Sequence, residues 1–410
     1  MKNNEVKEPK KRDPIFPVEG VLVGTAATGL RYKGRQDLAI FVISPGSNTS
    51  CFFTKNKFAA APIEIAKQNR EKKEALYLIV NSGNANAGTG ENGLTAASRI
   101  CESLAAEAGC EFENVLPFST GVIGEELDYS LIVNNIPKAL ASVTDGGWTE
   151  AAEAIMTTDT FPKVRSKKFT LGNDIHTVTG ICKGSGMIRP DMATMLAYIA
   201  TDASVSEPLL KEIGQTVLQS SFNRITVDGE TSTNDAVVFI ATGGAGSDKI
   251  TTESDPKYLK LLLSIGEICS ELAKDIVRDG EGATKLVSVE VTGAKTDDEA
   301  ALVAYSVAES SLVKTALFAE DPNWGRILSA VGASGVQELD CNKVDLFVGE
   351  HKVVSKGALD AQYREEKVAL VMKNKEFSVR VDLNNGECGT TVWTCDLSYD
   401  YVRINAEYRS

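Results

Sequence analysis

Residues 183–196 read KGSGMIRPDMATML, and this stretch joins a glycine-rich loop to an apolar run. The glycines and Pro190 indicate a loop, whereas the residues after Thr194 continue as MLAYIA, which is typical of a buried strand. Thr194 therefore stands at a junction between loop and strand, directly after the small residue Ala193. On this pattern alone, an ordinary strand threonine is the simplest interpretation.

The composition predicts a soluble globular protein with more than one core. The chain has 410 residues, of which 43% are hydrophobic and 24% charged. A formal net charge of −13 disfavours binding to nucleic acid or to an anionic membrane. Residues 1–15 lack the apolar core of a signal peptide and predict a flexible tail, so we expect a cytoplasmic protein with no membrane contact.

Histidine is scarce, and its scarcity restricts the chemistry. The two histidines, His176 and His351, both stand in stretches that predict strands or turns. A zinc site or a Ser-His-Asp relay is hard to build from this set, and we expect no metal. A hydroxyl nucleophile therefore needs a base other than histidine.

Thr194 can supply such a base if the chain is cut before it. An α-amino group has a pKa of roughly 7.7 to 8.0, close to neutral pH, and lies within reach of the threonine's own hydroxyl. Cleavage between Ala193 and Thr194 would create nucleophile and base together. This interpretation stays conditional on the cleavage.

Alternating helix and strand patterns predict the α/β class. We expect helices at 94–108, 258–280 and 297–318, a hairpin with its turn at 172–174, and a strand-rich region after residue 286. The glycine-rich stretch at 242–249 matches no phosphate-binding spacing, and we interpret it as a turn. We interpret 81–90 first as a loop that needs positive φ, with an anion nest as the alternative, and 279–285 first as a helix cap, with a site as the alternative.

The stretch KGSGMIRPDMATML resembles the activation segment of the ornithine acetyltransferases, the bifunctional arginine-biosynthesis enzymes also called glutamate N-acetyltransferases. Seven further blocks resemble that family in the same order, over residues 16–410. They are VNSGNANAGTG, FSTGVIG, MTTDTFPK, FNRITVDGETSTNDA, VRDGEGATK, AEDPNWGRILSAVGASG and YVRINAEYRS.

The resemblance implies a role for individual residues. Thr194 is similar to the family's nucleophile, which cleaves the bond after Ala193 and later takes the acetyl group, and Thr120 and Gly121 match its oxyanion hole. A lysine suits a substrate carboxylate and a glutamate suits an ammonium group, although a solvated surface pair is the alternative for Lys183 and Glu281. The implied substrate-binding residues are Thr157, Lys183, Thr194, Glu281, Asn405 and Ser410.

The implied reaction is a ping-pong transfer of acetyl from N-acetyl-L-ornithine to L-glutamate, with acetyl-CoA as a second donor in bifunctional members and with no cofactor. The implied fold is α/β, with layered sheets flanked by helices as in the DmpA-type aminopeptidases and other N-terminal nucleophile enzymes, plus a smaller strand-rich C-terminal domain. A self-activated aminopeptidase or amidase is the nearest rival, and a non-catalytic protein of the same fold is the second.

The same resemblance sets the expected organisation of the chain. We expect a tail at 1–15, a main domain at 16–285 and a C-terminal domain at 286–410. Cleavage would yield an α chain of residues 1–193 and a β chain of residues 194–410, which stay associated as a heterotetramer or a larger assembly.

Overall fold

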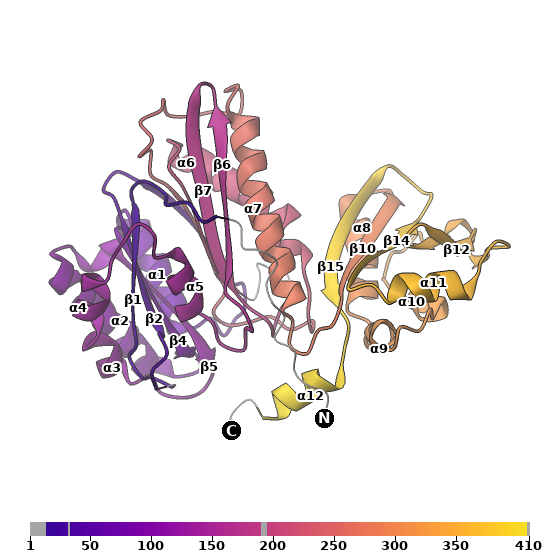
Figure 1. The fold of residues 1–410 in the computed structure, drawn as a ribbon, viewed down its shortest axis with the longest axis horizontal. Coiled ribbons are helices and arrows are strands. Elements are labelled where there is room, and N and C mark those ends of the chain that lie inside the picture. The colour runs from indigo at the N-terminus through magenta and orange to yellow at the C-terminus, as the bar shows by residue number, and fades with distance from the viewer. Residues whose placement is uncertain (1–13, 32, 190–194, 408–410) are drawn as a thin grey trace.

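Two stacked sheets with helices outside them form the main body, and a third sheet with its own helices lies beside it (Figure 1). The structure, a computed structural model, describes residues 14–31, 33–189 and 195–407. The expected α/β class with layered sheets and a smaller strand-rich C-terminal domain is confirmed.

The first sheet has four strands in the order β1-β2-β4-β5. β1 pairs with β2 and β2 pairs with β4 in antiparallel fashion, whereas β4 and β5 run parallel, which brings the ends of β4 and β5 to the same edge. The strands are β1 (Val21–Ala26), β2 (Leu38–Ile43), β4 (Tyr77–Asn84) and β5 (Val115–Val122).

The second sheet has five strands in the order β3-β9-β8-β7-β6, with only the β8 and β9 pair parallel. Leu171 pairs with Asp174 across the β6–β7 turn, which confirms the predicted hairpin. The strands are β3 (Asn48–Phe53), β6 (Lys163–Leu171), β7 (Asp174–Lys183), β8 (Leu196–Thr201) and β9 (Ala236–Ala241).

The two sheets pack face to face, α2 and α7 lie on their outer faces, and α5 packs into the core between the sheets. The ring centroids of Phe41 (β2) and Tyr198 (β8) lie 4.9 Å apart in the core between the sheets. Leu104 of α2 packs on the first sheet and Leu272 of α7 on the second. The helices of the main body are α1 (Ala61–Lys72), α2 (Gly90–Ala108), α3 (Tyr129–Val133), α4 (Ile136–Ala141), α5 (Trp148–Ala154), α6 (Glu207–Ser220) and α7 (Tyr258–Arg278).

Strands β7 and β8 are hydrogen-bonded neighbours on either side of the predicted cleavage site. Their register runs from Lys183 opposite Leu196 to Val178 opposite Thr201. The predicted cleavage bond, Ala193–Thr194, lies outside the described residues. The strand before it and the strand after it are nevertheless partners in one sheet.

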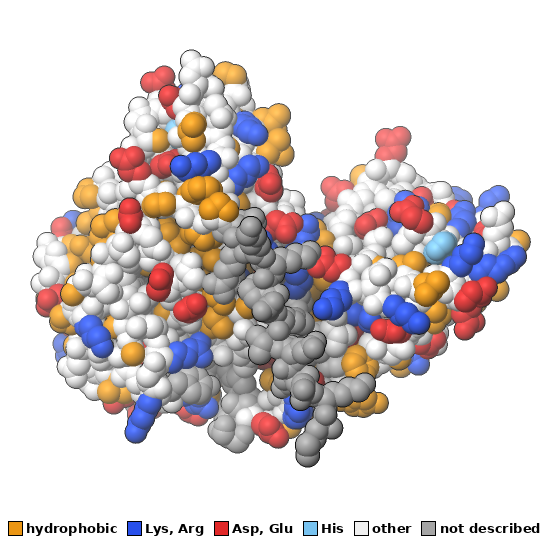
Figure 2. All heavy atoms as spheres, in the orientation of Figure 1, with side chains coloured by type: hydrophobic (Ala, Val, Ile, Leu, Met, Phe, Trp, Pro, Cys, Tyr) orange, Lys and Arg blue, Asp and Glu red, His pale blue; other side chains and the backbone are white. Residues whose placement is uncertain are grey.

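The C-terminal sheet has the order β13-β12-β11-β14-β10-β15 and a core of its own. Acidic and basic side chains are interspersed over this domain on the face in Figure 2. Its elements are β10 (Leu286–Ala294), α8 (Asp297–Ala308), α9 (Ser311–Ala319), α10 (Trp324–Gly332), β11 (Asp345–Val348), β12 (His351–Ser355), β13 (Ala358–Leu359), α11 (Glu365–Met372), β14 (Glu376–Asp382) and β15 (Cys388–Cys395). The last helix, α12 (Tyr399–Ala406), returns below the main body (Figure 1).

The prediction of one helix over 297–318 is wrong, because the chain breaks into α8 and α9. Ser310 takes an extended conformation and its side chain accepts a hydrogen bond from the Val313 N–H, so it caps a new helix. Among the described residues, no single helix has the length and apolar composition to cross a membrane. The pair α8 and α9 meets both criteria only when taken together across its 56° bend.

Candidate active site

A cavity of about 260 Å³ opens where β5, β7 and the loop after α7 meet α12. Six of the residues singled out from the sequence line it, which are Thr120, Gly121, Thr157, Lys183, Glu281 and Asn405. The other three, Ala193, Thr194 and Ser410, lie outside the described residues. Further lining residues that the sequence did not single out include Ile123, Thr158, Gly186, Met187, Ser232 and Asn234.

Gly121 lies at an irregular point of the β4–β5 pair, where only glycine fits. Its φ is +136°, and a Cβ atom there would lie 2.3 Å from the carbonyl carbon of Gly83 and 2.5 Å from the nitrogen of Asn84. The register of the two strands shifts at Asn84. The backbone at Thr120 and Gly121 therefore faces the cavity without a side chain at position 121.

Lys183, at the end of β7, contacts Thr120 directly. Its Nζ atom donates a hydrogen bond to Thr120 Oγ1 at 3.1 Å. Burial lowers the pKa of the Lys183 ammonium, and the nearby carboxylates, Asp159 first among them, only partly oppose this effect. The cavity thus holds a half-buried cation against the hydroxyl that the family resemblance assigns to the oxyanion hole.

Asp159 ties the loop that carries Thr157 to the end of β7. Its carboxylate accepts hydrogen bonds from the Thr157 N–H at 2.9 Å and the Gly184 N–H at 2.7 Å. Burial alone would raise its pKa, but the positive charges of Lys163 and Lys183 outweigh burial and hold the pKa well below its usual range. The carboxylate therefore stays ionised beneath the cavity.

Lys163 connects this carboxylate to the loop after α7. Its Nζ atom lies 2.6 Å from Asp159 Oδ1 and 2.6 Å from Asp279 Oδ2, and its side chain is fully buried. Asp279 also accepts a hydrogen bond from the Thr160 N–H at 2.9 Å. This buried network links the Thr157 loop, β7 and the Glu281 loop.

Glu281 faces the cavity from a Gly-rich loop, and Asn405 of α12 holds its carboxylate. Asn405 Nδ2 donates to Glu281 Oε2 at 2.7 Å, and the Glu281 N–H donates to Ser185 O at 2.7 Å. A Cβ atom at Gly186 would lie 2.5 Å from Glu281 Cδ, so the glycine lets the carboxylate approach the 183–186 loop. The surface-pair alternative for Glu281 is wrong, because only 9% of the residue is exposed.

The described chain after the predicted cleavage site runs beside Lys183, which lines this cavity. Met195, the first described residue after the gap, accepts a hydrogen bond from the Ala236 N–H at 3.0 Å, and Leu196 pairs with Lys183. Burial raises the pKa of Asp235 well above its usual range. Lys183 thus lies beside the strand that leads directly from Thr194.

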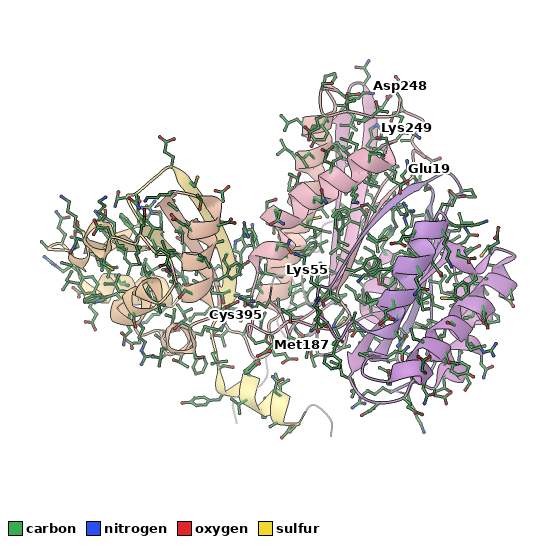
Figure 3. All side chains as sticks on the ribbon, turned by 180° about the vertical axis from the view of Figure 1, so that it is seen from behind. Glu19, Lys55, Met187, Asp248, Lys249 and Cys395 are labelled. Atoms are coloured by element: carbon green, nitrogen blue, oxygen red, sulfur yellow. The ribbon has the colours of Figure 1, made fainter. Side chains whose placement is uncertain are left out.

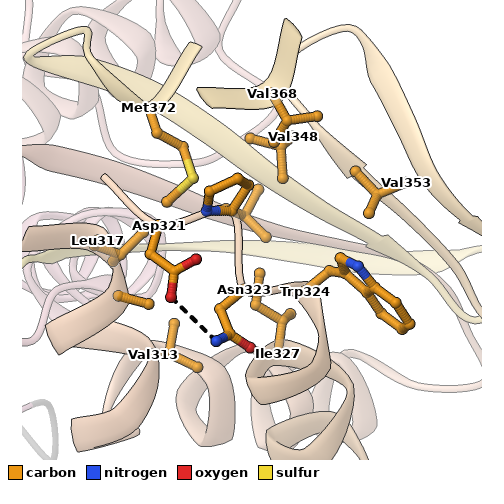
Figure 4. A pocket seen from close by; sticks show the side chains of 13 residues that line it. Val313, Leu317, Asp321, Asn323, Trp324, Ile327, Val348, Val353, Val368 and Met372 are labelled. Atoms are coloured by element: carbon orange, nitrogen blue, oxygen red, sulfur yellow. Dashed lines mark hydrogen bonds between the residues drawn. The ribbon is translucent and has the colours of Figure 1, made fainter. Parts of the chain in front are cut away.

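A second cavity, in the C-terminal domain, is too small for a substrate. It measures about 10 Å³ and is lined mostly by apolar side chains, among them Leu317, Trp324 and Met372 (Figure 4). Asn323 donates to Asp321 at its edge. A space of this size holds at most about one water molecule.

Comparison with known proteins gives the family. The model of the ArgJ family matches residues 22–410. The chain belongs to the ArgJ family. The resemblance recognised in the sequence blocks is thereby confirmed over nearly the whole chain.

Individual relatives agree with this assignment. The chain is 50% identical to the arginine biosynthesis bifunctional protein ArgJ of Psychrobacter arcticus, over 97% of this chain and 98% of that protein. It is 47% identical to the protein of that name from Neisseria meningitidis, over 98% of each chain. A crystal structure of arginine biosynthesis bifunctional protein argJ from Bacillus halodurans matches 52% of this chain and all of its own chain, at 41% identity and a TM-score of 0.51. Family membership supports a bifunctional transferase of arginine biosynthesis.

Sequence patterns give no signal for the residues beneath this cavity. Asp159 and Lys163 stand inside the block MTTDTFPK and Asp279 inside VRDGEGATK, but the resemblance gives them no role. The four-residue spacing of Asp159 and Lys163 suggests only a local pair. The 116 positions that separate Lys163 from Asp279 give no local signal at all.

Proposed function

We propose that this ArgJ family member transfers the acetyl group of N-acetyl-L-ornithine to L-glutamate through an acetyl-threonine at position 194. The observation that carries the proposal is that six residues implied by the family resemblance, drawn from separate regions of the chain, line one cavity. Family membership at up to 50% identity among the relatives described supports the same reaction class.

Maturation comes first and needs only Thr194 and water. The Thr194 hydroxyl attacks the Ala193 carbonyl, the peptide C–N bond breaks as an ester C–O bond forms, and the hydroxyl proton passes to the leaving nitrogen. Water then hydrolyses the ester. The products are a carboxylate on Ala193 and a free amine on Thr194, which becomes the base for transfer.

Acetyl transfer then uses the same hydroxyl twice. Thr194 attacks the acetyl carbonyl of acetylornithine, its proton passes to the leaving ornithine nitrogen, and the ester formed is attacked by the glutamate amine. Thr120 and Gly121 stabilise the oxyanion in each step. Lys183 receives a substrate carboxylate and Glu281 the ornithine ammonium, while Thr157, Asn405 and Ser410 complete the binding site. We propose that acetyl-CoA can serve as a second acetyl donor. We also propose that the α chain and the β chain stay associated after cleavage.

The test separates transfer from hydrolysis. Purified protein is incubated with acetylornithine with and without glutamate, and ornithine and acetylglutamate are measured by mass spectrometry. We expect ornithine release to depend on glutamate and to match acetylglutamate formation. Release that ignores glutamate would favour the amidase. A parallel assay with acetyl-CoA and glutamate determines the donor range.

A further inference from the structure

Residues 187–189, the last described residues before the predicted cleavage site, are held by a carboxylate from another loop. Asp228 accepts hydrogen bonds from the N–H groups of Met187 at 2.6 Å and Ile188 at 2.8 Å. The Ile188 carbonyl in turn accepts from the Val227 N–H at 2.9 Å and from Thr226 Oγ1 at 3.2 Å. Bonds to an ionised acceptor are about twice as strong as neutral ones, so Asp228 is the main anchor.

Met187 adopts a conformation that this anchor must enforce. Its φ is +56°, in the left-handed region that residues other than glycine rarely adopt. Figure 3 shows it at the junction of the main body and the C-terminal domain. Because the strained residue precedes the cleavage site by only a few positions, its conformation affects the direction in which the chain approaches that site.

The C-terminal domain supplies a second anchor. Arg189 Nε donates to Glu309 Oε1 at 3.0 Å, and Glu309 ends helix α8. The two side chains are 41% and 24% exposed. Thr226 Oγ1 lies 3.5 Å from the same oxygen of Glu309, so both anchors meet at one place.

We propose that Asp228 and Glu309 are positioning residues for self-cleavage, and that docking of the C-terminal domain through Glu309 is therefore a condition for rapid maturation. This inference rests on the proposed function, because it requires cleavage at Ala193–Thr194. Neither residue contacts the reacting atoms in this proposal. They act by fixing residues 187–189.

The length of the connection makes such control effective. Arg189 is separated from Ala193 by only three residues in the sequence, so a shift of Arg189 moves the start of the segment that carries the predicted cleavage bond. Attack of a hydroxyl on a carbonyl needs the reacting atoms about 3 to 3.5 Å apart, and a misplacement of about 1 Å costs on the order of a hundredfold in rate. The net reaction adds one water across the peptide bond and requires no other reactant.

The experiment measures cleavage rates of newly synthesised full-length chains. Protein is made in a cell-free system with a short labelled pulse, translation is stopped, and the uncleaved fraction is followed on denaturing gels. Asp228→Asn, whose amide oxygen replaces a carboxylate, is expected to slow cleavage at least about tenfold. Glu309→Gln is expected to slow it about fivefold, and Glu309→Arg about tenfold or more.

Matched variants keep the test specific. Glu207→Gln removes an ion pair between α6 and Arg70 of α1, away from the cleavage segment, and Asp255→Asn removes a carboxylate that accepts a backbone N–H. Both are expected to cleave within about twofold of wild type. Arg189→Glu combined with Glu309→Arg restores the pair with reversed charges and is expected to recover most of the rate.

The outcomes separate this inference from the proposed function. Slow cleavage in the Asp228 and Glu309 variants, rescue by the charge swap, and unchanged kcat and KM in the cleaved Glu309→Gln enzyme support the inference. Cleavage at the wild-type rate in folded Asp228→Asn and Glu309→Arg chains overturns the inference. If either of these chains fails to fold, the cleavage rate of Glu309→Gln decides instead, and a wild-type rate in that variant overturns the inference. Wild-type chains that never cleave would overturn the proposed maturation itself.

Discussion

The Nζ atom of Lys183 lies 3.1 Å from Thr120 Oγ1 and donates a hydrogen bond to it. Because the Thr120 oxygen accepts this bond, its own proton is available for an oxyanion in the cavity. In the proposed reaction, the cation also polarises that hydroxyl at the place where negative charge develops. Under that proposal, substrate binding and transition-state stabilisation meet at one pair of side chains.

Thr120→Val and Lys183→Met should each lower kcat by about a hundredfold, since each breaks the same donor arrangement. The double variant should be only slightly slower than either single variant, because the two residues act as one unit. Ornithine release at saturating acetylornithine measures kcat. Thr158→Val, which alters a hydroxyl of the same cavity bonded to Ser185 at 2.6 Å, is the control and should stay within a few-fold. Fully multiplicative losses would contradict the coupling.

The transfer rate should fall on the alkaline side at a pH below 10.5, the usual lysine value, because burial lowers the Lys183 pKa. The protonated amine is the active form, so activity is lost as the pH rises through the lowered pKa. A kcat profile between about pH 6 and 11 tests this, and in Lys183→Met the alkaline limb should disappear while the acidic limb, from the Thr194 amine near roughly 7.7 to 8.0, remains.

Lys163→Met should destabilise the protein by about 3 to 5 kcal/mol, because it leaves Asp159 and Asp279 buried without their shared cation. Urea unfolding of the uncleaved Thr194→Ala background measures the change. Lys167→Met, on the same strand but in a partly exposed pair with Glu267, should cost less than about 1 kcal/mol. Equal costs for the two variants would argue against the network.

Gly121→Ala should lower the free energy of unfolding by roughly 2 to 4 kcal/mol, since the added Cβ atom meets the Gly83 backbone at 2.3 Å. Gly172→Ala is the matched control, because Gly172 also has a positive φ but has open space around its missing Cβ. It should cost about 1 kcal/mol. Thermal denaturation measures the Tm of both variants. A similar decrease in Tm for the two would show that the tight contact at Gly121 is not the cause of the loss of stability.

Thr194→Ala should abolish both self-cleavage and transfer, because it removes the hydroxyl that attacks in each reaction. Thr194→Ser retains a hydroxyl and should still cleave. Mass spectrometry of the purified chains detects the products, and the β chain should begin with residue 194. Processing at this position in Thr194→Ala would disprove the mechanism.

Local pattern predicted the long elements well. The helix expected at 258–280 is α7 (Tyr258–Arg278), with Gly280 just past its end, and the hairpin turn at 172–174 is correct. The helix expected at 94–108 begins earlier, at Gly90. Its first four residues, GENG, are polar or glycine and therefore carry no apolar pattern that would predict a helix. The break at Ser310 was readable as a capping serine, but the apolar spacing on both sides suggested continuity.

In the candidate site, too, the residues within motifs were predictable and the contacts between distant residues were not. Residues such as Lys183 and Glu281 were found by motif, and the structure places them in one cavity. The network beneath depends on contacts such as Thr160 with Asp279, 119 positions apart, and no local pattern encodes a contact that tertiary packing creates. Glu309 was missed for the same reason, since its partner Arg189 belongs to another domain.

The pairing of β7 with β8 has a consequence for any study of the mature enzyme. If the chain is cut between these strands, six consecutive residue pairs still join the two pieces within one sheet. Unfolding would then release two separate molecules, so recovery from denaturant would become a second-order process that slows on dilution. The uncut Thr194→Ala chain would recover at a rate independent of concentration, which makes it the suitable reference for reversible thermodynamics.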